Sequence, residues 1–279
     1  MTEALDRIAV AVFPQAAARD LGHLGDIRML APDRAYEWAT DLTRGQVQAL
    51  CPGADVAVLP RAGRRKSLLI CDMDSTLIGQ ECIDELADFA GVKDRVSAIT
   101  ERAMRGEIGF EGALRERVGL LKGLPESVVD DCFAQRISLN PGARTLARTM
   151  AANGAKTVIV SGGFTAFSAK VADAAGFAHH QANVLIFEGG EFTGTVAEPI
   201  LGREAKREAL LEHSGNTPET AIAVGDGAND LAMIEAAGIG VAYRAKPAVA
   251  AAAGCAIDRT DLTTALFFQG YSEDEFVLD

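Results

Sequence analysis

The sequence predicts an α/β fold, in which short strands alternate with helices along most of the chain. Residues 67–71, 156–160 and 221–224 are short, mainly apolar runs that each end abruptly in polar residues. Runs of this length are typical of strands that are buried on both faces. The segments between them have the patterns of helices, and strands that alternate with helices form a parallel sheet with right-handed connections. We therefore expect a parallel sheet as the core of the chain.

Residues 1–65 are predicted to form a small N-terminal α+β domain, separate from a larger domain over residues 66–279. Residues 8–13 and 54–59 have the composition of strands, and residues 46–50 that of a helix. Residues 60–66 combine proline and glycine with four cations, which is typical of a linker. No residue of the first domain points to a particular chemistry, so the sequence leaves its role open.

The segment at about 78–139 is predicted to be a helical cap inserted into the larger domain. Its apolar residues recur three or four positions apart, as in Phe110, Leu114, Val118 and Leu121. This pattern predicts successive helices, with no further strand before about residue 155. An insertion directly after the first strand of a parallel sheet lies over the carboxyl ends of the strands, which is where a lid would lie.

The rest of the larger domain returns to alternating helices and strands. Asn140 and Pro141 predict the start of a helix that runs to about Gly154, with Asn140 as its N-cap. Residues 184–187 and 192–196 are predicted to form a hairpin. Further helices are expected at 164–175, 203–212 and 231–237, and a further strand at 239–242.

The composition is that of an ordinary globular protein with an acidic charge balance. Of the 279 residues 48% are hydrophobic, and the net charge is −12, which argues against a nucleic acid or an anionic membrane as a partner. The five cysteines are scattered and lack C-x-x-C spacing, so we expect reduced packing residues of a cytoplasmic protein rather than zinc ligands or disulfides. No apolar run approaches the ~18 residues of a membrane span, and the N-terminus lacks the pattern of a secretion signal.

Three of the predicted strands end in residues that can carry chemistry. These are Asp72 and Asp74 after the first strand, Ser161 and Gly162 after the second, and Asp226, Asn229 and Asp230 after the third. A parallel sheet brings such strand ends to one edge, and Lys206, near a helix start, would lie close to them. Carboxylates suit Mg²⁺, and hydroxyl, amide and ammonium donors suit a phosphate group. Beside a metal, one aspartate can attack phosphorus while a second transfers protons.

The order of these motifs resembles that of the haloacid-dehalogenase-like phosphatases. The motifs are D-M-D-S-T at 72–76, V-S-G-G-F at 160–164, A-K-R-E at 205–208 and G-D-G-A-N-D at 225–230. Two motifs of the insertion, E-C-I-D-E-L at 81–86 and G-F-E-G-A-L-R-E-R-V at 109–118, are similar to those of the phosphoserine phosphatase family. The resemblance covers about residues 67–255 and implies a Rossmann-like parallel sheet core with an inserted helical cap.

The resemblance implies the following roles for the carboxylates. Asp72 would be the nucleophile, and Asp74 would be the general acid and base. Mg²⁺ would be held by the Asp72 side chain, the Asp74 backbone carbonyl and Asp226. Asp230 would orient the water ligands of the metal without binding it directly.

The resemblance also implies how the phosphate would be bound. Ser161 and Gly162 would bind the phosphoryl oxygens, and Lys206 would neutralise the charge that develops on them. Asn229 would contact the phosphate or the rest of the substrate. All of these groups are donors, as a phosphate site requires.

Four residues of the insertion bear on the rest of the substrate, and each has two interpretations. Arg117 lies along an apolar helix stripe, either as a boundary residue with a buried stem or as a fork for a carboxylate. Glu81 opens its helix, where negative charge is favourable in any case, or it binds an ammonium group. By pattern alone Met104 and Phe110 belong to the core. The resemblance implies that they are apolar lid walls, and it favours substrate contact for all four.

The function implied by the resemblance is Mg²⁺-dependent hydrolysis of O-phospho-L-serine to L-serine and phosphate through an aspartyl-phosphate, the last step of serine biosynthesis. One alternative is a related small-molecule phosphatase, or a phosphotransferase such as a homoserine phosphotransferase. Another is that residues 1–65 bind an amino acid and control the larger domain. We expect a small-molecule partner, no nucleic acid and no membrane, whereas the sequence does not give the oligomeric state.

Overall fold

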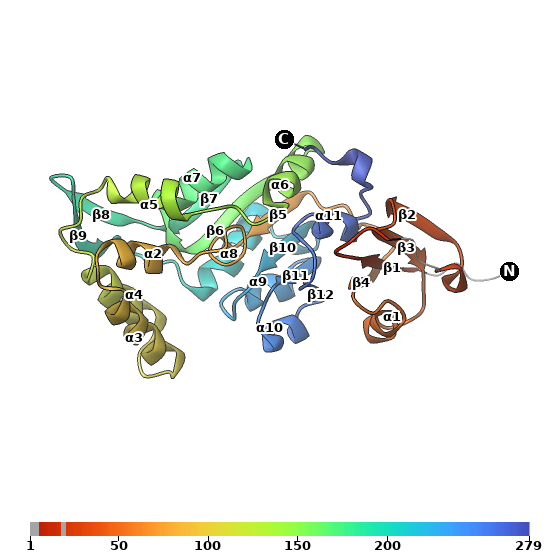
Figure 1. Cartoon of the computed structure of the whole chain (residues 1–279), viewed down its shortest axis with the longest axis horizontal. Coiled ribbons are helices and arrows are strands. Elements are labelled where there is room, and N and C mark those ends of the chain that lie inside the picture. The colour runs from red at the N-terminus through yellow and green to blue at the C-terminus, as the bar shows by residue number, and fades with distance from the viewer. Residues whose placement is uncertain (1–5, 18–20, 279) are drawn as a thin grey trace.

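The computed structural model describes residues 6–17 and 21–278, apart from the side chains of His23 and Met104. Three regions lie in a row along the longest axis of the molecule (Figure 1). A parallel sheet with its helices forms the central region, and an antiparallel sheet forms the N-terminal region at one end. A group of helices and a hairpin lie at the opposite end.

The central sheet has six parallel strands in the order β12-β11-β10-β5-β6-β7. They are β5 (Leu68–Cys71), β6 (Lys156–Phe164), β7 (His179–Asn183), β10 (Ala221–Gly225), β11 (Ile239–Tyr243) and β12 (Cys255–Ile257). The strands predicted at 67–71, 156–160, 221–224 and 239–242 are thereby confirmed. β7 and β12 were not predicted, because the first is polar and the second is short. Both are edge strands, which need not be apolar on both faces.

Helices cover both faces of this sheet, which explains why its inner strands are apolar throughout. On one face, Leu69 and Ile159 share an apolar cluster with residues of α6 (Ala143–Ala152), α7 (Thr165–Ala175) and α11 (Thr264–Phe268). On the other, Ile70 and Val158 share a cluster with residues of α8 (Arg203–His213) and α9 (Leu231–Ala236). α10 (Pro247–Ala252) and two short 3-10 helices, Pro218–Thr220 and Glu273–Glu275, complete the region. The predicted α/β class is confirmed.

The predicted N-cap of α6 is wrong, because this helix begins at Ala143 rather than at Pro141. The side chain of Asn140 is used elsewhere: its amide donates to the backbone carbonyl of Thr76 at 2.8 Å. Gly142 precedes the helix with a φ of 81°, and a Cβ there would lie 2.6 Å from the backbone nitrogen of Thr263. Only glycine fits this position without strain.

The N-terminal region is an antiparallel sheet in the order β2-β3-β1-β4. Its elements are β1 (Arg7–Val12), a 3-10 turn (Gly22–Leu24), β2 (Ile27–Ala31), β3 (Ala35–Ala39), α1 (Arg44–Leu50) and β4 (Asp55–Pro60). Along β1, Ala9 belongs to the cluster under α1, whereas Ile8 and Val10 belong to the main core. The sheet is therefore buried on both faces. The strands predicted at 8–13 and 54–59 and the helix predicted at 46–50 are confirmed, whereas β2 and β3 were not predicted.

Polar contacts also join the N-terminal region to the central one. Asp55 is 4% exposed and accepts hydrogen bonds from the backbone N–H groups of Arg259 and Thr260 at 3.1 and 2.9 Å. Arg65, in the predicted linker, forms an ion pair with Glu275 at 2.6 Å. The boundary between two domains at residue 65 stays a prediction, since the two regions share an apolar core.

The insertion contains the helices α2 (Cys82–Phe89), α3 (Lys93–Met104), α4 (Phe110–Gly119) and α5 (Val128–Arg136), as predicted. An antiparallel bridge between Ile78 and Leu139 closes it at its base. The predicted hairpin, β8 (Leu185–Glu188) and β9 (Glu191–Val196), leaves the central region and packs beside α4 (Figure 1). The backbone N–H of Phe192 donates to the carbonyl of Leu124 at 2.9 Å. The insertion is thus held both at its base and by the hairpin.

All five cysteines are buried thiols, as the sequence predicts; they are Cys51, Cys71, Cys82, Cys132 and Cys255. They fill space in the apolar clusters of both sheets and of the insertion. Among the described residues, no helix combines the length and the apolar character that crossing a membrane requires.

Candidate active site

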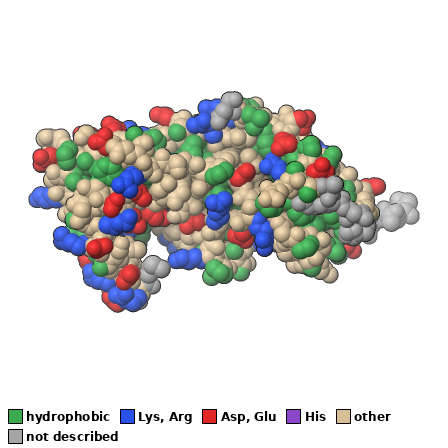
Figure 2. Space-filling view, viewed as in Figure 1, with side chains coloured by type: hydrophobic (Ala, Val, Ile, Leu, Met, Phe, Trp, Pro, Cys, Tyr) green, Lys and Arg blue, Asp and Glu red, His purple; other side chains and the backbone are tan. Residues whose placement is uncertain are grey.

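The carboxyl ends of β5, β6 and β10 meet at one edge of the sheet and, together with the insertion, enclose a pocket of about 140 Å³. The sheet edge contributes Asp72, Asp74, Ser161, Gly162, Asp226 and Asn229 to its lining. The insertion contributes Glu81, Ile83, Phe110, Leu114 and Arg117. On the face drawn in Figure 2, the arm formed by α3 and α4 stands away from the central region and the surface is hollowed between them. The pocket suits a small polar ligand, since drug-sized ligands occupy roughly 300–1,000 Å³.

Lys206 lies at the floor of the site between two carboxylates. Its Nζ is 2.7 Å from Asp72 Oδ2 and 2.6 Å from Asp230 Oδ1, and all three side chains are buried. Burial alone would lower the pKa of Lys206, but the two carboxylates outweigh it and raise that pKa above its usual value. The lysine is therefore a permanent cation at the end of β5. The other oxygen of Asp72 accepts the backbone N–H of Met73 at 2.7 Å.

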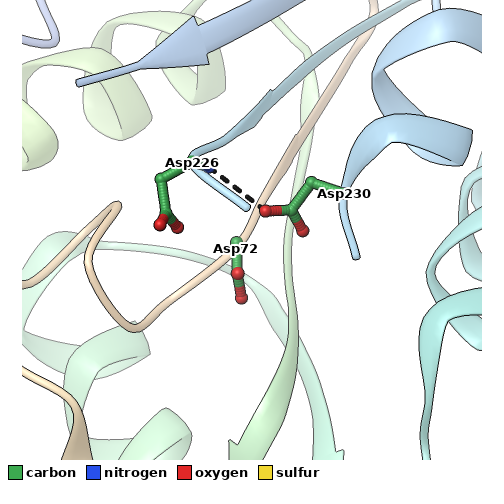
Figure 3. A group of neighbouring side chains, drawn as sticks. All are labelled: Asp72, Asp226 and Asp230. Atoms are coloured by element: carbon green, nitrogen blue, oxygen red, sulfur yellow. Dashed lines mark hydrogen bonds between the residues drawn. The ribbon is translucent and has the colours of Figure 1, made fainter. Parts of the chain in front are cut away.

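Asp72, Asp226 and Asp230 form a cluster of carboxylates (Figure 3). One oxygen from each lies within 4.8 Å of the others. Burial and the charge of Asp230 raise the pKa of Asp72 well above its usual value, and the same two causes raise the pKa of Asp226 to about 6. A single lysine does not balance three carboxylates. The cluster therefore fits a divalent cation with oxygen ligands.

Asp230 bonds through both of its carboxylate oxygens at the edge of the sheet. One of its oxygens contacts Lys206, and the other accepts the backbone N–H groups of Asp226 and Gly227 at 3.1 and 2.9 Å. These contacts fix the loop after β10. The side chain of Asp230 is thus part of the carboxylate cluster, and its role toward a metal stays a prediction.

Asp74, two residues beyond Asp72, is half-buried and faces the start of α2. Its Oδ1 accepts the backbone N–H of Cys82 at 3.2 Å. Burial and the charge of Glu81 raise the pKa of Asp74 to about 7. A carboxyl with such a pKa exchanges protons readily near neutral pH, which suits a general acid and base.

The turn after Asp74 joins the D-M-D-S-T motif to its neighbours through two hydroxyl groups. Ser75 has a φ of 56°, and its hydroxyl donates to Glu81 Oε1 at 2.6 Å. Thr76 is buried and donates to Asp226 Oδ1 at 3.1 Å. The sequence gives no sign of the Thr76 contact, because its partner lies 150 residues away and only the fold brings the two together.

Ser161 and the two glycines after it form the third wall of the pocket. Ser161 is buried, and its Oγ accepts the backbone N–H of Gly163 at 2.9 Å. A Cβ at position 163 would lie 2.6 Å from Asp74 Oδ2. A side chain at this position would therefore displace the Asp74 carboxylate, where the end of β6 passes the end of β5. The structure thus brings Ser161 and Gly162 into the same pocket as the aspartates, as the sequence predicts.

The residues predicted on the insertion side lie at the mouth of the pocket. Phe110 is 43% exposed, and its ring reaches within 3.3 Å of the position that a Cβ of Gly162 would occupy. Arg117 is half-buried, and its Nε donates to the carbonyl of Ala113 at 3.2 Å; within the described residues no carboxylate forms an ion pair with it. Glu81 is exposed at the start of α2. The side chain of Met104 lies outside the described residues.

Two apolar residues of the lining, Ile83 and Leu114, were predicted only as the buried stripes of their helices. Both also line the pocket. Helical spacing shows which face of a helix is apolar, but it does not separate a core contact from a pocket wall. The sequence therefore held no signal for this part of the site.

Comparison with known proteins gives consistent matches. The haloacid dehalogenase-like hydrolase family matches residues 69–235. A curated phosphoserine phosphatase of Archaeoglobus fulgidus is 44% identical over 215 residues, which cover 75% of this chain and 62% of that protein. The chain thus spans slightly less than two thirds of that relative.

Two solved structures are also similar. A HAD family hydrolase of Salmonella enterica serovar Typhi matches with a TM-score of 0.82 and 28% identity, covering 96% of this chain and 99% of that one. A phosphoserine phosphatase solved as an analogue of its phospho-aspartyl intermediate matches with a TM-score of 0.66 and 39% identity. It covers 73% of this chain and 99% of its own. The first match extends over the N-terminal region as well.

Proposed function

The chain belongs to the haloacid dehalogenase-like hydrolases, and from this premise we propose that it is a Mg²⁺-dependent phosphatase that hydrolyses O-phospho-L-serine to L-serine and phosphate. The observation that carries the proposal is the content of the pocket, where Asp72 lies together with Glu81 and Arg117. Phosphoserine has a phosphate, an ammonium and a carboxylate group. In the pocket, Asp72 would react with the phosphate, Glu81 would bind the ammonium group and Arg117 would bind the carboxylate. The names of the Archaeoglobus relative and of the phospho-aspartyl structure support the same activity.

Asp72 is the nucleophile in this proposal, and the reaction takes two steps. In the first, an oxygen of Asp72 attacks phosphorus, the bond between phosphorus and the seryl oxygen breaks, and Asp74 donates its proton to that oxygen. In the second, Asp74 takes a proton from water and the water oxygen attacks phosphorus. The bond between phosphorus and the Asp72 oxygen breaks, which releases phosphate and restores the carboxylate. The raised pKa of Asp74, about 7, supports both transfers near neutral pH.

The phosphoryl oxygens are bound by donors from three elements. Ser161 and the backbone of Gly162 contribute from the end of β6, Asn229 from the loop after β10, and Lys206 from α8. Lys206 already lies 2.7 Å from the Asp72 oxygen, so its charge is in place as negative charge shifts onto the phosphoryl group.

The carboxylate cluster is the proposed place of Mg²⁺. The Asp72 and Asp226 side chains and the Asp74 backbone carbonyl would hold the ion, with Asp230 beside them in the cluster. Bound there, Mg²⁺ would offset the repulsion between the attacking carboxylate and the phosphate dianion.

The insertion selects the substrate in this proposal. Arg117 binds the carboxylate of phosphoserine and Glu81 binds its ammonium group. Phe110 covers the pocket from α4, and Met104 is proposed to complete the apolar wall.

We also propose a cytoplasmic location, because five buried thiols without a disulfide are typical of a reducing compartment.

Phosphate release from L-phosphoserine tests the proposal, with p-nitrophenyl phosphate as a comparison ester and with Mg²⁺ present or chelated. The expected result is Mg²⁺-dependent turnover with a large preference for phosphoserine. Activity on p-nitrophenyl phosphate alone would keep the phosphatase chemistry and contradict the assigned substrate. Adding excess homoserine and measuring phosphohomoserine separates hydrolysis from phosphoryl transfer to an alcohol.

A further inference from the structure

Asn183, at the end of β7, is a buried amide that the sequence motifs do not include. Its side chain is 2% exposed and makes three hydrogen bonds to backbone groups. Nδ2 donates to the carbonyls of Gly162 and Leu201 at 2.9 and 3.3 Å. Oδ1 accepts the N–H of Leu201 at 2.7 Å. The amide therefore joins two segments of backbone that lie far apart in the sequence.

The bond to Gly162 reaches the hydroxyl of Ser161 through one peptide unit. The carbonyl of Gly162 and the N–H of Gly163 belong to the same planar, trans peptide and point in opposite directions. The carbonyl is held by Asn183, and the N–H donates to Ser161 Oγ at 2.9 Å. This bond occupies a lone pair of the hydroxyl, so its proton remains available for an acceptor in the pocket.

The side chain of Asn183 bonds at a point where the regular pairing of β6 with β7 is interrupted. Val160 lies opposite Gln181 and Phe164 opposite Asn183, so β6 has two residues more than β7 over this stretch. Such a bulge turns backbone groups away from the sheet and toward a site. Regular pairing is interrupted here, and the side chain of Asn183 bonds to the bulged backbone at Gly162.

The bonds to Leu201 connect Asn183 to the segment that leads into α8. Leu201 precedes Gly202, the N-cap of α8, and α8 carries Lys206. Between Asn183 and Leu201 the chain forms the hairpin that packs on α4. One amide therefore fixes the phosphate-binding turn, the approach to the lysine helix and the base of the hairpin.

We propose that Asn183 is a positioning residue, which holds the Gly162–Gly163 peptide so that the Ser161 hydroxyl is aimed at the phosphoryl group. The inference rests on the proposed phosphatase function. It assigns to Asn183 no contact with the substrate. Its effect on catalysis passes through Ser161.

The test is a double-mutant cycle with Asn183→Leu, Ser161→Ala and the double variant, assayed at saturating Mg²⁺. Asn183→Leu keeps the number and branching of the side-chain heavy atoms, although leucine is bulkier, and it removes all three hydrogen bonds. We expect kcat to fall roughly 10- to 100-fold, the range that is usual when a residue that orients a metal ligand is replaced. In the Ser161→Ala background the same change is expected to cost much less, because the group that it orients is gone.

Gln269→Met is the matched control. Gln269 is also a buried amide, bonded to the carbonyl of Ala265 at 3.0 Å and to the N–H of Lys66 at 3.1 Å, and it lies outside the pocket. It is expected to lower Tm as Asn183→Leu does but to leave kcat unchanged. If Asn183→Leu does not fold, Asn183→Asp, which keeps the acceptor and loses the donors, takes its place in the cycle.

A kcat near that of the wild type for the Asn183 variant would overturn the proposal. It would also be overturned if the kcat loss of the double variant equalled the product of the two single losses, because Asn183 would then act independently of Ser161. Running the cycle with p-nitrophenyl phosphate in parallel separates this inference from the proposed function. If the wild type accepts only that ester, the assigned substrate is wrong, while the coupling between Asn183 and Ser161 is still measured.

Discussion

The two ends of the pocket are built in different ways. At the sheet end Asp72, Lys206 and Asp230 are buried and bonded to one another. At the insertion end Phe110 is 43% exposed and Arg117 is only half-buried. A buried charge that loses its partner is costly, so the sheet end holds one arrangement, whereas exposed residues on helices move at little cost. We infer that the sheet end carries the reaction and the insertion end selects the substrate.

The substitution Asp72→Asn removes the proposed nucleophile from the sheet end, and it is expected to have the largest effect on activity. We expect kcat to fall by more than about a thousandfold on phosphoserine and on p-nitrophenyl phosphate alike. Circular dichroism should show an intact fold, because the amide occupies the same volume. Turnover at the wild-type rate, after mass spectrometry has excluded deamidation, would move the nucleophile elsewhere.

The substitution Lys206→Met leaves two buried carboxylates without their cation. We expect roughly a hundredfold loss of kcat or more, as for the removal of a group that stabilises transition-state charge. The free energy of unfolding should also fall by about 3–5 kcal/mol, as is usual when one partner of a buried pair is removed.

Lys170→Met is the control, since Lys170 of α7 forms an ion pair with the exposed Asp130 of α5. It should change the free energy of unfolding by less than about 1 kcal/mol. Equal losses in urea unfolding for the two variants would show that the Lys206 contacts contribute no more than a surface pair.

The substitution Arg117→Ala sharpens the comparison from the insertion end. We expect kcat/KM for phosphoserine to fall roughly 10- to 100-fold, the usual worth of a hydrogen bond between charged groups. Hydrolysis of p-nitrophenyl phosphate, which has no carboxylate, should hardly change. Arg115→Ala is the control on the same helix, because Arg115 pairs with Glu111 and Glu198 on the exposed side. Equal losses on both esters would remove Arg117 from substrate recognition.

The pH dependence of stability reports on the carboxylates of the sheet end. In the folded chain the pKa of Asp74 is about 7 and that of Asp226 about 6, against a usual 3.8. The folded protein therefore binds these protons more tightly than the unfolded one, so both groups lower stability as pH rises from about 4 to about 7. Mg²⁺ should restore more stability at pH 7.5 than at pH 5, because it binds the deprotonated groups.

Urea midpoints at both pH values, with and without Mg²⁺, measure this effect. Asp226→Asn is the control, and it should reduce both the loss with pH and the gain from Mg²⁺. A gain from Mg²⁺ that does not depend on pH would show that the ion does not bind at the carboxylate cluster.

The same contrast explains how much the sequence could predict. Asp72, Ser161 and Asp226 follow apolar strands, and a parallel sheet brings strand ends together, so the sheet end of the pocket was predictable from local pattern. The contacts of Asn183 and Thr76 were not, because their partners are fixed only by the fold. The insertion end was predictable in part: helical spacing predicted the helices, but it did not predict which apolar residues line the pocket.

Two further features could not be predicted because a side chain bonds to a partner that is distant in the sequence. Asn140 is a good N-cap by sequence, but its amide is used by Thr76, so the helix begins at Ala143. Asp55 reads as part of a strand, yet its carboxylate holds the turn at Arg259 and Thr260, more than two hundred residues away. Neither contact leaves a signal in the neighbouring sequence.

Trapping the intermediate tests the central claim most directly. The enzyme is mixed with phosphoserine and Mg²⁺, quenched after a fraction of a turnover and reduced with borohydride, which converts an aspartyl-phosphate to homoserine. Peptide mass spectrometry should find homoserine at position 72 in the wild type, and none in Asp72→Asn. Homoserine at another position, or none anywhere while phosphate is released at the full rate, would contradict a nucleophilic Asp72.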